Sequence, residues 1–237
     1  VIQYPPLIYS AKSAGSRLNV NNERVPLEQG DNIVFDYPNE ITSVTATRNT
    51  ALTYIQIPNT VTEIEDFAFQ YCSSLSSITL PNSLTSIGDS AFEGCNKLAS
   101  ITIPDGVKSI GGSTFYRCTS LISINIPDGM TSIGGSAFAN CTSLISINIP
   151  DGVTSIGSYT FQNCTALTDF NFNGTMAQWG AITLGTDWNK DAAFTVVHCT
   201  DGDVIPPTPL IYSAKSAGST IKVNGETVTL AKGNNIV

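Results

Sequence analysis

The apolar positions of this chain repeat in one fixed phase through its central part. Cysteine occurs at positions 72, 95, 118, 141 and 164, each step being 23 residues, and leucine, isoleucine and phenylalanine keep the same spacing. One copy has the pattern L-x-x-I-x-I-P-D/N-x-V-x-x-I-G-x-x-A-F-x-x-C-x-x. A period of about 20 to 29 residues with this leucine spacing indicates one strand plus a helix or 3₁₀ turn per copy. The pattern predicts an α/β solenoid whose coils share one parallel β-sheet.

A short alternating segment in each copy predicts the strand. In Ser77-Ile78-Thr79-Leu80, alternation in a strand sends Ile78 and Leu80 into the core and Ser77 and Thr79 outward. Proline has no N–H to donate within a ladder, so each strand is expected to end at the proline that follows it. These prolines are Pro58, Pro81, Pro104, Pro127 and Pro150, and three of them precede Asp-Gly dipeptides that predict turns.

The second half of each copy is expected to form a short helical or 3₁₀ turn. Asp66, Asp89 and Ser158 stand just before the small residue and phenylalanine of the repeat, where such a turn would need an N-cap acceptor. A glycine precedes this position in most coils, and we expect it to adopt a positive φ that a side chain would disfavour. These glycines are Gly88, Gly111, Gly134 and Gly157.

The repeat also sets the expected domain boundaries. The burial of apolar side chains within a single coil does not offset the backbone entropy lost when that coil becomes ordered. Coils must therefore stack on one another, and the ends of the stack must be covered. We expect an N-terminal β cap over residues 1–50, a solenoid over 51–172 and a C-terminal cap over 173–205. In the C-terminal cap, Met176, Trp179 and Ile182 have the spacing of a short helix with its apolar side on the last coil, and a strand is expected at 194–197. Trp179 and Trp188 are interpreted as core of this cap.

A longer duplication relates the two ends. Leu7 to Val34 matches Leu210 to Val237 with 19 of 28 positions identical, and each copy follows a proline cluster that predicts a stiff linker. Residues 206–237 are therefore expected to be the truncated start of a second tandem unit. The coils at 121–143 and 144–166 agree at 17 of 23 positions, which indicates recent copying of one module.

Composition narrows the classes of partner. The net charge is −8 and the pI about 4.4, which argues against nucleic acid because phosphates attract a basic face. No apolar run approaches the roughly 20 residues that span a bilayer, and Val1 does not open a signal peptide. We expect no insertion into a membrane, a signal peptide that lies outside this sequence, and a monomer within a longer tandem chain.

The cysteines are expected to be free thiols. Five of them occupy one equivalent site in successive coils. When residues stack about 4.8 Å apart, their Cβ vectors run parallel rather than toward each other, which suits a disulfide poorly. We predict a buried ladder of thiols, with Cys199 unassigned.

Candidate catalytic chemistry is sparse, and we expect no enzyme and no cofactor. His198, the only histidine, precedes Cys199. Neighbouring side chains in a strand point to opposite faces, so this histidine would not activate the thiol, and we expect it to be half-exposed and structural. Glycosylation acceptor patterns at Asn140, Asn163 and Asn173 are interpreted as coincidence.

One column of acidic and amide residues allows two interpretations. It falls at one position of successive coils and consists of Asn59, Asn82, Asp105, Asp128 and Asp151. Stacked carboxylates repel each other, and a calcium ion with oxygen ligands at about 2.3–2.6 Å would relieve this repulsion. Alternatively, each side chain bonds the backbone of its own turn. The favoured interpretation contains no metal.

The outward strand positions form the candidate ligand face, expected on the concave side. One column is Tyr54, Ser77, Ser100, Ser123, Ser146 and Asp169, and the other is Gln56, Thr79, Thr102, Asn125, Asn148 and Asn171. Hydroxyls and amides suit sugars or extended peptides, although such ladders also simply satisfy a solvated sheet. The face lacks the Trp, Tyr and Arg anchors of tight protein binding. Aromatic contacts would come from the ends and edges, at Tyr37, Tyr54, Tyr116, Tyr159 or Phe170.

The repeat unit resembles a known family. The unit I-P-D-G-V-T-S-I-G with its phenylalanine and cysteine, as in Ile149 to Cys164, strongly resembles the BspA-like (TpLRR-type) leucine-rich repeat family over about residues 50–172. The stretch from Asn173 to Trp179, with residues 198–202, is similar to the tail that closes these arrays. The resemblance implies a right-handed leucine-rich repeat coil in large surface or secreted proteins of bacteria and some mucosal protozoa, associated with attachment to host matrix proteins and other cells. It implies no catalytic residues and no individual binding positions.

Together these observations predict a non-catalytic binding module on a bacterial cell surface or in a secreted protein. We expect adhesion to host or extracellular matrix proteins through the concave sheet or an edge, with low affinity and multivalent contact. A glycan-binding module and an architectural spacer that displays other domains are the alternatives.

Overall fold

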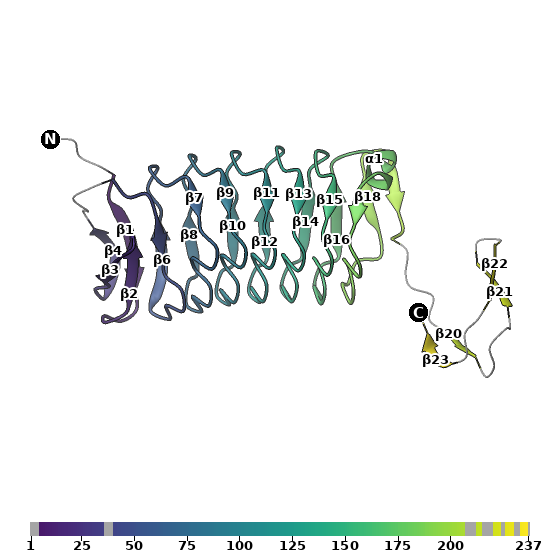
Figure 1. Ribbon diagram of the computed structural model, residues 1–237, viewed down its shortest axis with the longest axis horizontal. Helices are drawn as coiled ribbons and strands as arrows, with labels where there is room; N and C mark the ends of the chain where they lie inside the picture. Colours follow the sequence, from purple (N-terminus) through teal and green to yellow (C-terminus); the bar gives the residue numbers. More distant parts are fainter. Residues whose placement is uncertain are drawn as a thin grey trace. The chain divides into compact units, whose positions relative to one another are not determined.

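The protein is known here from a computed structural model that describes residues 5–35, 40–206, 212–214, 220–223, 226–229 and 233–236. The chain divides into unit 1, Val1–Val204, and unit 2, Ile205–Val237. Unit 1 is a parallel β-solenoid whose coils stack in a row (Figure 1). Tyr37, one of the residues considered for aromatic contact, lies outside the described residues, as does part of the predicted linker, at 207–209.

The first ladder of the solenoid contains one strand from each coil. Its strands are β6 (Leu52–Gln56), β8 (Ser77–Thr79), β10 (Ser100–Thr102), β12 (Ser123–Asn125), β14 (Ser146–Ile149) and β16 (Asp169–Phe172). Paired neighbours are parallel and keep the repeat in register, as in Ile101 with Ile124 and Ile147 with Phe170. The apolar residue is buried between outward polar residues, as the alternation predicts.

Each coil also contains a second, shorter strand, so the prediction of one sheet was wrong. These strands are β7 (Glu63–Ile64), β9 (Ser86–Ile87), β11 (Ser109–Ile110), β13 (Ser132–Ile133) and β15 (Ser155–Ile156), followed by β17 (Thr183–Leu184). They pair in parallel, and β11, β13, β15 and β17 form one sheet. The sequence did not reveal this second ladder because a strand of 2 residues is too short to show alternation.

The segment after the second ladder forms tight turns instead of the predicted short helical or 3₁₀ turn. From Gly88 to Cys164 no residue is helical. Two residues per coil take a left-handed backbone. The first position has φ from 54° to 60° and is Phe67, Ser90, Ser113, Ser136 or Tyr159, and the second is Tyr71, Gly94, Arg117, Asn140 or Asn163. The N–H of Phe92 bonds to the carbonyl of Thr114 in the next coil at 2.9 Å. Alternate N–H groups bond the neighbouring coil, while those between them close single turns, as in Glu93 to the carbonyl of Ser90 at 3.1 Å, so no continuous helix forms.

Asp66 and Asp89 act between coils and are not N-caps of their own turns. Oδ1 of Asp66 accepts a hydrogen bond from the N–H of Asp89 at 2.7 Å, and Oδ1 of Asp89 accepts one from the N–H of Gly112 at 2.6 Å. Ser158 Oγ likewise accepts from the N–H of Thr186 at 3.0 Å. Each of these side chains joins its own turn to the following one.

The glycines after the second ladder do not adopt the predicted positive φ. Gly88, Gly111, Gly134 and Gly157 all have ordinary φ values, and the described glycines with a positive φ are Gly15, Gly30, Gly94 and Gly202. A Cβ on Gly134 would lie 2.6 Å from the carbonyl carbon of Gly111. Glycine is required here because the backbones of adjacent coils approach too closely for a side chain.

The core between the two ladders consists of nearly identical layers. One phenylalanine per coil, from Phe69 to Phe161, stacks on the next with ring centroids 5.4–5.5 Å apart and planes within 5–7°. The cysteines lie in the same buried cluster, and their thiols are free. Cys118 Sγ donates to the carbonyl of Phe92 at 3.1 Å, and the other ladder cysteines make equivalent bonds. The prediction of buried free thiols is confirmed.

Residues before the first coil form antiparallel strands next to it. β1 (Leu7–Ala11) lies between β4 (Gly30–Phe35) and β6, antiparallel to both. β2 (Arg17–Val20) lies between β3 (Glu23–Pro26) and β5 (Val44–Thr45). Leu7, Leu18 and Val20 belong to the same buried cluster as the coils, so the hydrophobic core continues into these strands.

The last coil is followed by α1 (Met176–Gly180), β17, β18 (Val197–Cys199) and β19 (Gly202–Val204). Thr175 caps α1 and forms a capping box with Gln178. Trp179 and Trp188 are buried, and each ring centroid lies 5.7 Å from that of Phe170. Met176, however, is 39% exposed, and the strand expected at 194–197 begins only at Val197, so these two details of the prediction were wrong.

Unit 2 contains β20 (Tyr212–Ala214), β21 (Thr220–Val223), β22 (Glu226–Thr229) and β23 (Gly233–Ile236). β20 pairs with β23 through Tyr212 and Ile236, which is the register of Tyr9 and Ile33 in unit 1. β21 pairs with β22 in the register of β2 and β3. The duplicated sequences therefore form equivalent strand pairs.

Candidate functional site

The residues predicted to contact a ligand lie on the outer side of the first ladder, which we call the strand face. It consists of the two predicted columns, from Tyr54 to Asp169 and from Gln56 to Asn171. Parallel register places Ser100 beside Ser123 and Thr102 beside Asn125, and every member is exposed or half-buried. Consecutive coils therefore bring each column together as a row of polar side chains.

Side chains in the centre of the strand face keep their hydrogen-bonding groups available. At one end, the Tyr54 hydroxyl lies 3.3 Å from both Gln56 Oε1 and Thr79 Oγ1. At the other end, Asn171 Nδ2 donates to Asp169 Oδ1 at 3.0 Å. Within the described part of the chain, the remaining side chains of this face make no hydrogen bond to other protein groups. Their hydroxyls and amides are open to solvent or to a ligand.

Two features interrupt the regular strand face. A depression of about 340 Å³ lies between β8 and β10 and is lined by residues that include Ser77, Leu80 and Thr102. Ile122 and Ile145 stand just before β12 and β14 and are 49% and 51% exposed. Both isoleucines occupy a position that is serine, alanine or threonine in other coils. The two isoleucines are visible in the sequence, but they were not among the predicted contact residues.

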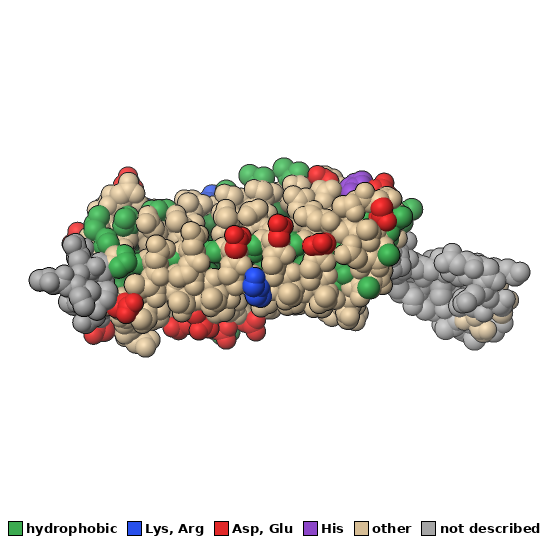
Figure 2. All heavy atoms as spheres, turned by 90° about the horizontal axis from the view of Figure 1, so that it is seen from above, with side chains coloured by type: hydrophobic (Ala, Val, Ile, Leu, Met, Phe, Trp, Pro, Cys, Tyr) green, Lys and Arg blue, Asp and Glu red, His purple; other side chains and the backbone are tan. Residues whose placement is uncertain are grey.

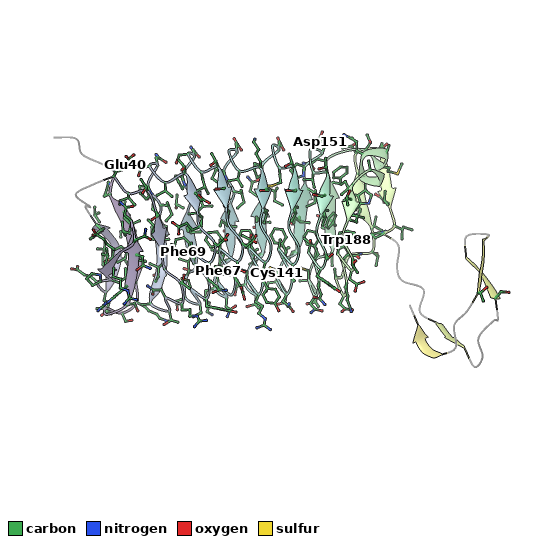
Figure 3. The ribbon with its side chains drawn as sticks, viewed as in Figure 1. Glu40, Phe67, Phe69, Cys141, Asp151 and Trp188 are labelled. Carbon is green, nitrogen blue, oxygen red and sulfur yellow. The ribbon has the colours of Figure 1, made fainter. Side chains whose placement is uncertain are left out.

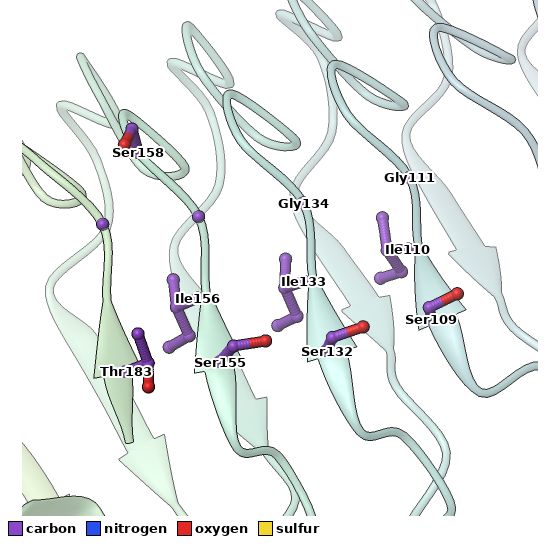
Figure 4. A pocket seen from close by; sticks show the side chains of 12 residues that line it. Ser109, Ile110, Gly111, Ser132, Ile133, Gly134, Ser155, Ile156, Ser158 and Thr183 are labelled. Atoms are coloured by element: carbon purple, nitrogen blue, oxygen red, sulfur yellow. The ribbon is translucent and has the colours of Figure 1, made fainter. Parts of the chain in front are cut away.

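A second open groove runs along the other ladder and was not predicted. It has a volume of about 530 Å³, and the hydroxyls of Ser109, Ser132, Ser155 and Thr183 follow it across the coils (Figure 4). A glycine stands two residues after each of these hydroxyl residues, so the floor of the groove consists of backbone atoms and isoleucine side chains. The lining contains no charged group, so a ligand in this groove would meet hydroxyl groups and no ionic partner.

The acidic column does not form a metal site in the described structure. Asp105, Asp128 and Asp151 are exposed at one edge, where Figure 3 labels Asp151 and where Figure 2 shows regularly spaced acidic side chains. No three His, Cys, Asp or Glu side chains among the described residues are grouped closely enough to hold a metal ion. The expected bonds from these carboxylates to their own turns are also absent from the described contacts. Lys108 Nζ instead donates to the Asp105 carbonyl at 3.2 Å.

The thiols and the histidine are not arranged for catalysis. Burial raises the pKa of Cys72 and Cys164 to about 12 and that of the three cysteines between them well above its ordinary value. His198 is exposed, and its Nδ1 lies 2.9 Å from Asp203 Oδ1 on the adjacent strand. The histidine therefore pairs with a carboxylate and not with the thiol of Cys199.

The repeat, its register and the shared core agree with one family of proteins. BspA type leucine-rich repeat regions match residues 39–168 in 6 copies, which is more than half of the chain. The chain belongs to the BspA type leucine-rich repeat family. The resemblance inferred from the I-P-D-G-V-T-S-I-G unit is thereby confirmed, and the BspA type fold is the solenoid described above. No curated protein sequence matches the chain significantly.

Solved structures similar to this BspA type chain are bacterial repeat proteins. A leucine rich cell surface protein from Faecalibacterium prausnitzii is 36% identical, with a TM-score of 0.57 over 66% of this chain and 42% of that chain. A leucine-rich repeat protein from Bacteroides ovatus is 29% identical, with a TM-score of 0.50 over 62% and 46%. The leucine rich repeat protein of T. pallidum is 26% identical, with a TM-score of 0.48 over 61% and 77%. The chain therefore spans less than half the length of the first two proteins.

The BspA type family and the Faecalibacterium prausnitzii protein are both described as leucine-rich repeats, and neither description names a catalytic activity. In the part of the chain that the structure describes, no helix has the length and apolar character needed to cross a membrane.

Proposed function

We propose that the chain is a non-catalytic, repetitive binding module of a bacterial cell-surface or secreted protein. Membership of the BspA type family supports this proposal, as does the likeness to a protein described as a cell surface protein. Its proposed role is adhesion to host or extracellular matrix proteins, as a monomeric unit within a longer tandem chain. The proposed contact area is the strand face, which we expect on the concave side because it consists of the outward strand positions.

The observation that carries the proposal is the row of available polar groups at coil spacing. A single hydroxyl or amide hydrogen bond contributes about 0.5–1.5 kcal/mol net, so one coil alone would bind weakly. Equivalent groups recur at about 4.8 Å, the spacing of neighbouring strands, and linked contacts raise avidity without a strong individual site. The exposed side chains of Ile122 and Ile145 add apolar area at the margin of this face.

A binding screen with matched variants tests the proposal. The chain is applied to immobilised matrix proteins and to a glycan array, and binding is read by surface plasmon resonance and fluorescence. Ser123→Arg, Asn125→Arg and Asn148→Arg together place bulky charges at the centre of the strand face and should reduce protein binding at least tenfold. The control variant carries arginine at Thr119, Thr142 and Thr165, which are exposed elsewhere on the coils.

The outcomes of this screen separate the candidate functions. Equal loss of binding in both variants would place the contact away from the strand face. Binding to glycans but not to matrix proteins would replace adhesion to proteins by glycan capture. Absence of binding to both matrix proteins and glycans would favour an architectural spacer.

A further inference from the structure

The turns of the first coils carry a group of arginine and tyrosine side chains that the strand-face proposal does not use. We call this group, Arg48, Tyr71, Glu93, Tyr116 and Arg117, the Arg–Tyr cluster. Arg48, Tyr71 and Arg117 occupy the same position of their turns and share a left-handed backbone, with φ of 58°, 56° and 60°. Equal backbone geometry directs all three side chains from the same edge of the solenoid.

A hydrogen-bonded platform holds Tyr71 within the cluster. Its hydroxyl donates to Glu93 Oε1 at 2.6 Å, and Gln70 Nε2 donates to Glu93 Oε2 at 2.8 Å. Burial alone would raise the pKa of Glu93, but the hydrogen bonds from Tyr71, Gln70 and Ser90, together with the nearby charge of Arg117, outweigh it and lower this pKa. Both oxygens of the ionised carboxylate are therefore engaged within the protein.

Gly94 is the member of this column in the coil between Tyr71 and Arg117. A Cβ on Gly94 would meet the Tyr71 ring, with Cε1 only 2.9 Å away. Glycine thus lets the ring lie across the coil of Gly94. The neighbouring coils provide Arg48 on one side and Arg117 on the other, and both charges act on the Tyr71 hydroxyl.

The two guanidinium groups lie next to aromatic rings and form no salt bridge with any described residue. Cζ of Arg48 is 6.0 Å from the ring centroid of Tyr71, and Cζ of Arg117 is 5.1 Å from that of Tyr116. Both arginines are exposed. The salt bridges found among the described residues are Lys190 with Asp187 and His198 with Asp203, so neither arginine has a carboxylate within 4.0 Å.

We propose that the Arg–Tyr cluster binds a short carboxylate-bearing segment of a protein partner. A guanidinium offers planar paired donors that fit a carboxylate, and tyrosine and arginine are enriched among residues that dominate protein interfaces. The cluster has two positive groups against the single carboxylate of Glu93, whereas the whole chain has a net charge of −8. This site lies outside the strand face, and the inference stands or falls separately from the proposed function.

The surrounding charges restrict the partner to a short acidic segment. Glu65, Asp66 and Asp89 are exposed at the start of the same turns that carry the cluster. An extended polyanion would pass over these carboxylates and be repelled, whereas one or two carboxylates fit between the arginines. The acidic column of Asp105 to Asp151 lies in a different turn of each coil, after the first ladder, whereas the cluster follows the second ladder.

The test uses the full chain and a short defined probe. Fluorescein-labelled Gly-Glu-Gly-Glu-Gly is titrated at low salt, with Gly-Gln-Gly-Gln-Gly as the uncharged counterpart and fluorescence anisotropy as the measurement. Arg48→Gln combined with Arg117→Gln should weaken binding of the acidic peptide about tenfold or more. The control, Arg17→Gln combined with Arg24→Gln, removes two exposed arginines elsewhere and should leave binding unchanged.

Three results would overturn the proposal. One is equal binding of the acidic and uncharged peptides, and another is equal loss of binding in the two double variants. The third is tighter binding of a heparin fragment than of the acidic peptide, which would indicate a site for polyanions. Circular dichroism of each variant shows whether the solenoid is intact.

Discussion

At the scale of single residues, the buried thiols make the stability of the solenoid depend on pH. Cys95, Cys118 and Cys141 are fully buried, and burial raises their pKa well above the ordinary 9.0. The unfolded chain releases these protons near that pH, while the folded chain retains them. The contribution of the protonated thiols to the free energy of unfolding is therefore fully present below about pH 9, and it is lost as the pH rises toward the folded-state pKa values. Each thiol contributes a slope of about 1.4 kcal/mol per pH unit.

The variant Cys118→Ala tests this coupling. At neutral pH it should lower the free energy of unfolding by about 1–2 kcal/mol, because it leaves a small cavity and removes the donor to the Phe92 carbonyl. Above pH 9 its stability should fall less steeply with pH than that of the unmodified chain, by about 1.4 kcal/mol per unit. Urea unfolding at pH 7, 9 and 10 measures both effects. Identical slopes would contradict the account, and Cys199→Ala, at a half-buried site, serves as the control.

A glycine pair separates close backbone approach from intrinsic helix preference. Gly134→Ala should destabilise the chain by about 1–3 kcal/mol, because its Cβ would lie against the backbone of Gly111 and push the coils apart. Gly180→Ala, in α1, meets nothing within 4 Å and should be neutral or stabilising by up to about 1 kcal/mol. The midpoint of urea unfolding, measured for each variant, distinguishes the two effects. If Gly134→Ala left the midpoint unchanged, the close approach would not be what requires glycine there.

At the scale of elements, each turn is closed by local hydrogen bonds and is also joined to the next coil. The carboxylate of Asp89 bonds the N–H of Gly112, and main-chain N–H groups such as that of Phe115 bond carbonyls of the following coil. Each turn therefore completes its hydrogen bonds only when its neighbour is in place. The predicted helical turn is therefore replaced by a turn that depends on the neighbouring coil.

Removal of one such side chain tests the joining of the turns. Asp89→Ala should lower the free energy of unfolding by about 1 kcal/mol, since a charge-assisted bond to a backbone N–H is lost at an exposed site. Asp151→Ala removes an exposed carboxylate without a described hydrogen bond and should change stability by less than about 0.5 kcal/mol. Thermal unfolding followed by circular dichroism compares the two. Equal shifts in both variants would mean that the bond to Gly112 contributes nothing.

At the scale of the whole molecule, unit 1 is a stack in which each coil contacts only its neighbours. The phenylalanine rings repeat at a constant 5.4–5.5 Å, and the strands that pair between coils keep the 23-residue register. Stability in such an array is close to a sum of coil terms and interface terms. The length of the stack should therefore change its stability in steps without changing its architecture.

Deletion of residues 121–143 provides the corresponding test. Ser120 would then precede Leu144, which occupies the same repeat position as Leu121, so the register of both ladders continues. We expect a folded solenoid with one coil fewer, a smaller urea m-value because less surface is buried, and lower stability. Circular dichroism and urea unfolding measure these changes. Loss of cooperative unfolding would show that this coil has a role beyond its place in the stack.

Sequence reasoning succeeded where the physical cause is a repeated side chain. The positions of Ile101 and Cys118 follow from periodicity, because an apolar residue in constant phase must face a common core. It failed at Gly134 and Asp89, whose roles depend on how close the next coil comes. The groove beside Ser132 was missed for the same reason, since it lies between coils. The Arg–Tyr cluster was missed except for Tyr116, because its members are scattered through four coils.

The sequence alone determined that the chain is a solenoid, which face of each first-ladder strand is polar, that the repeated thiols are buried, and which family the repeat resembles. These properties depend on residue type and period, both of which are visible along the chain. Only the tertiary structure decided the second ladder, the joined turns, the need for glycine between coils and the grouping of Arg48, Tyr71 and Arg117. These depend on the distance and orientation between adjacent coils, and that geometry is set by backbone packing rather than by any local pattern.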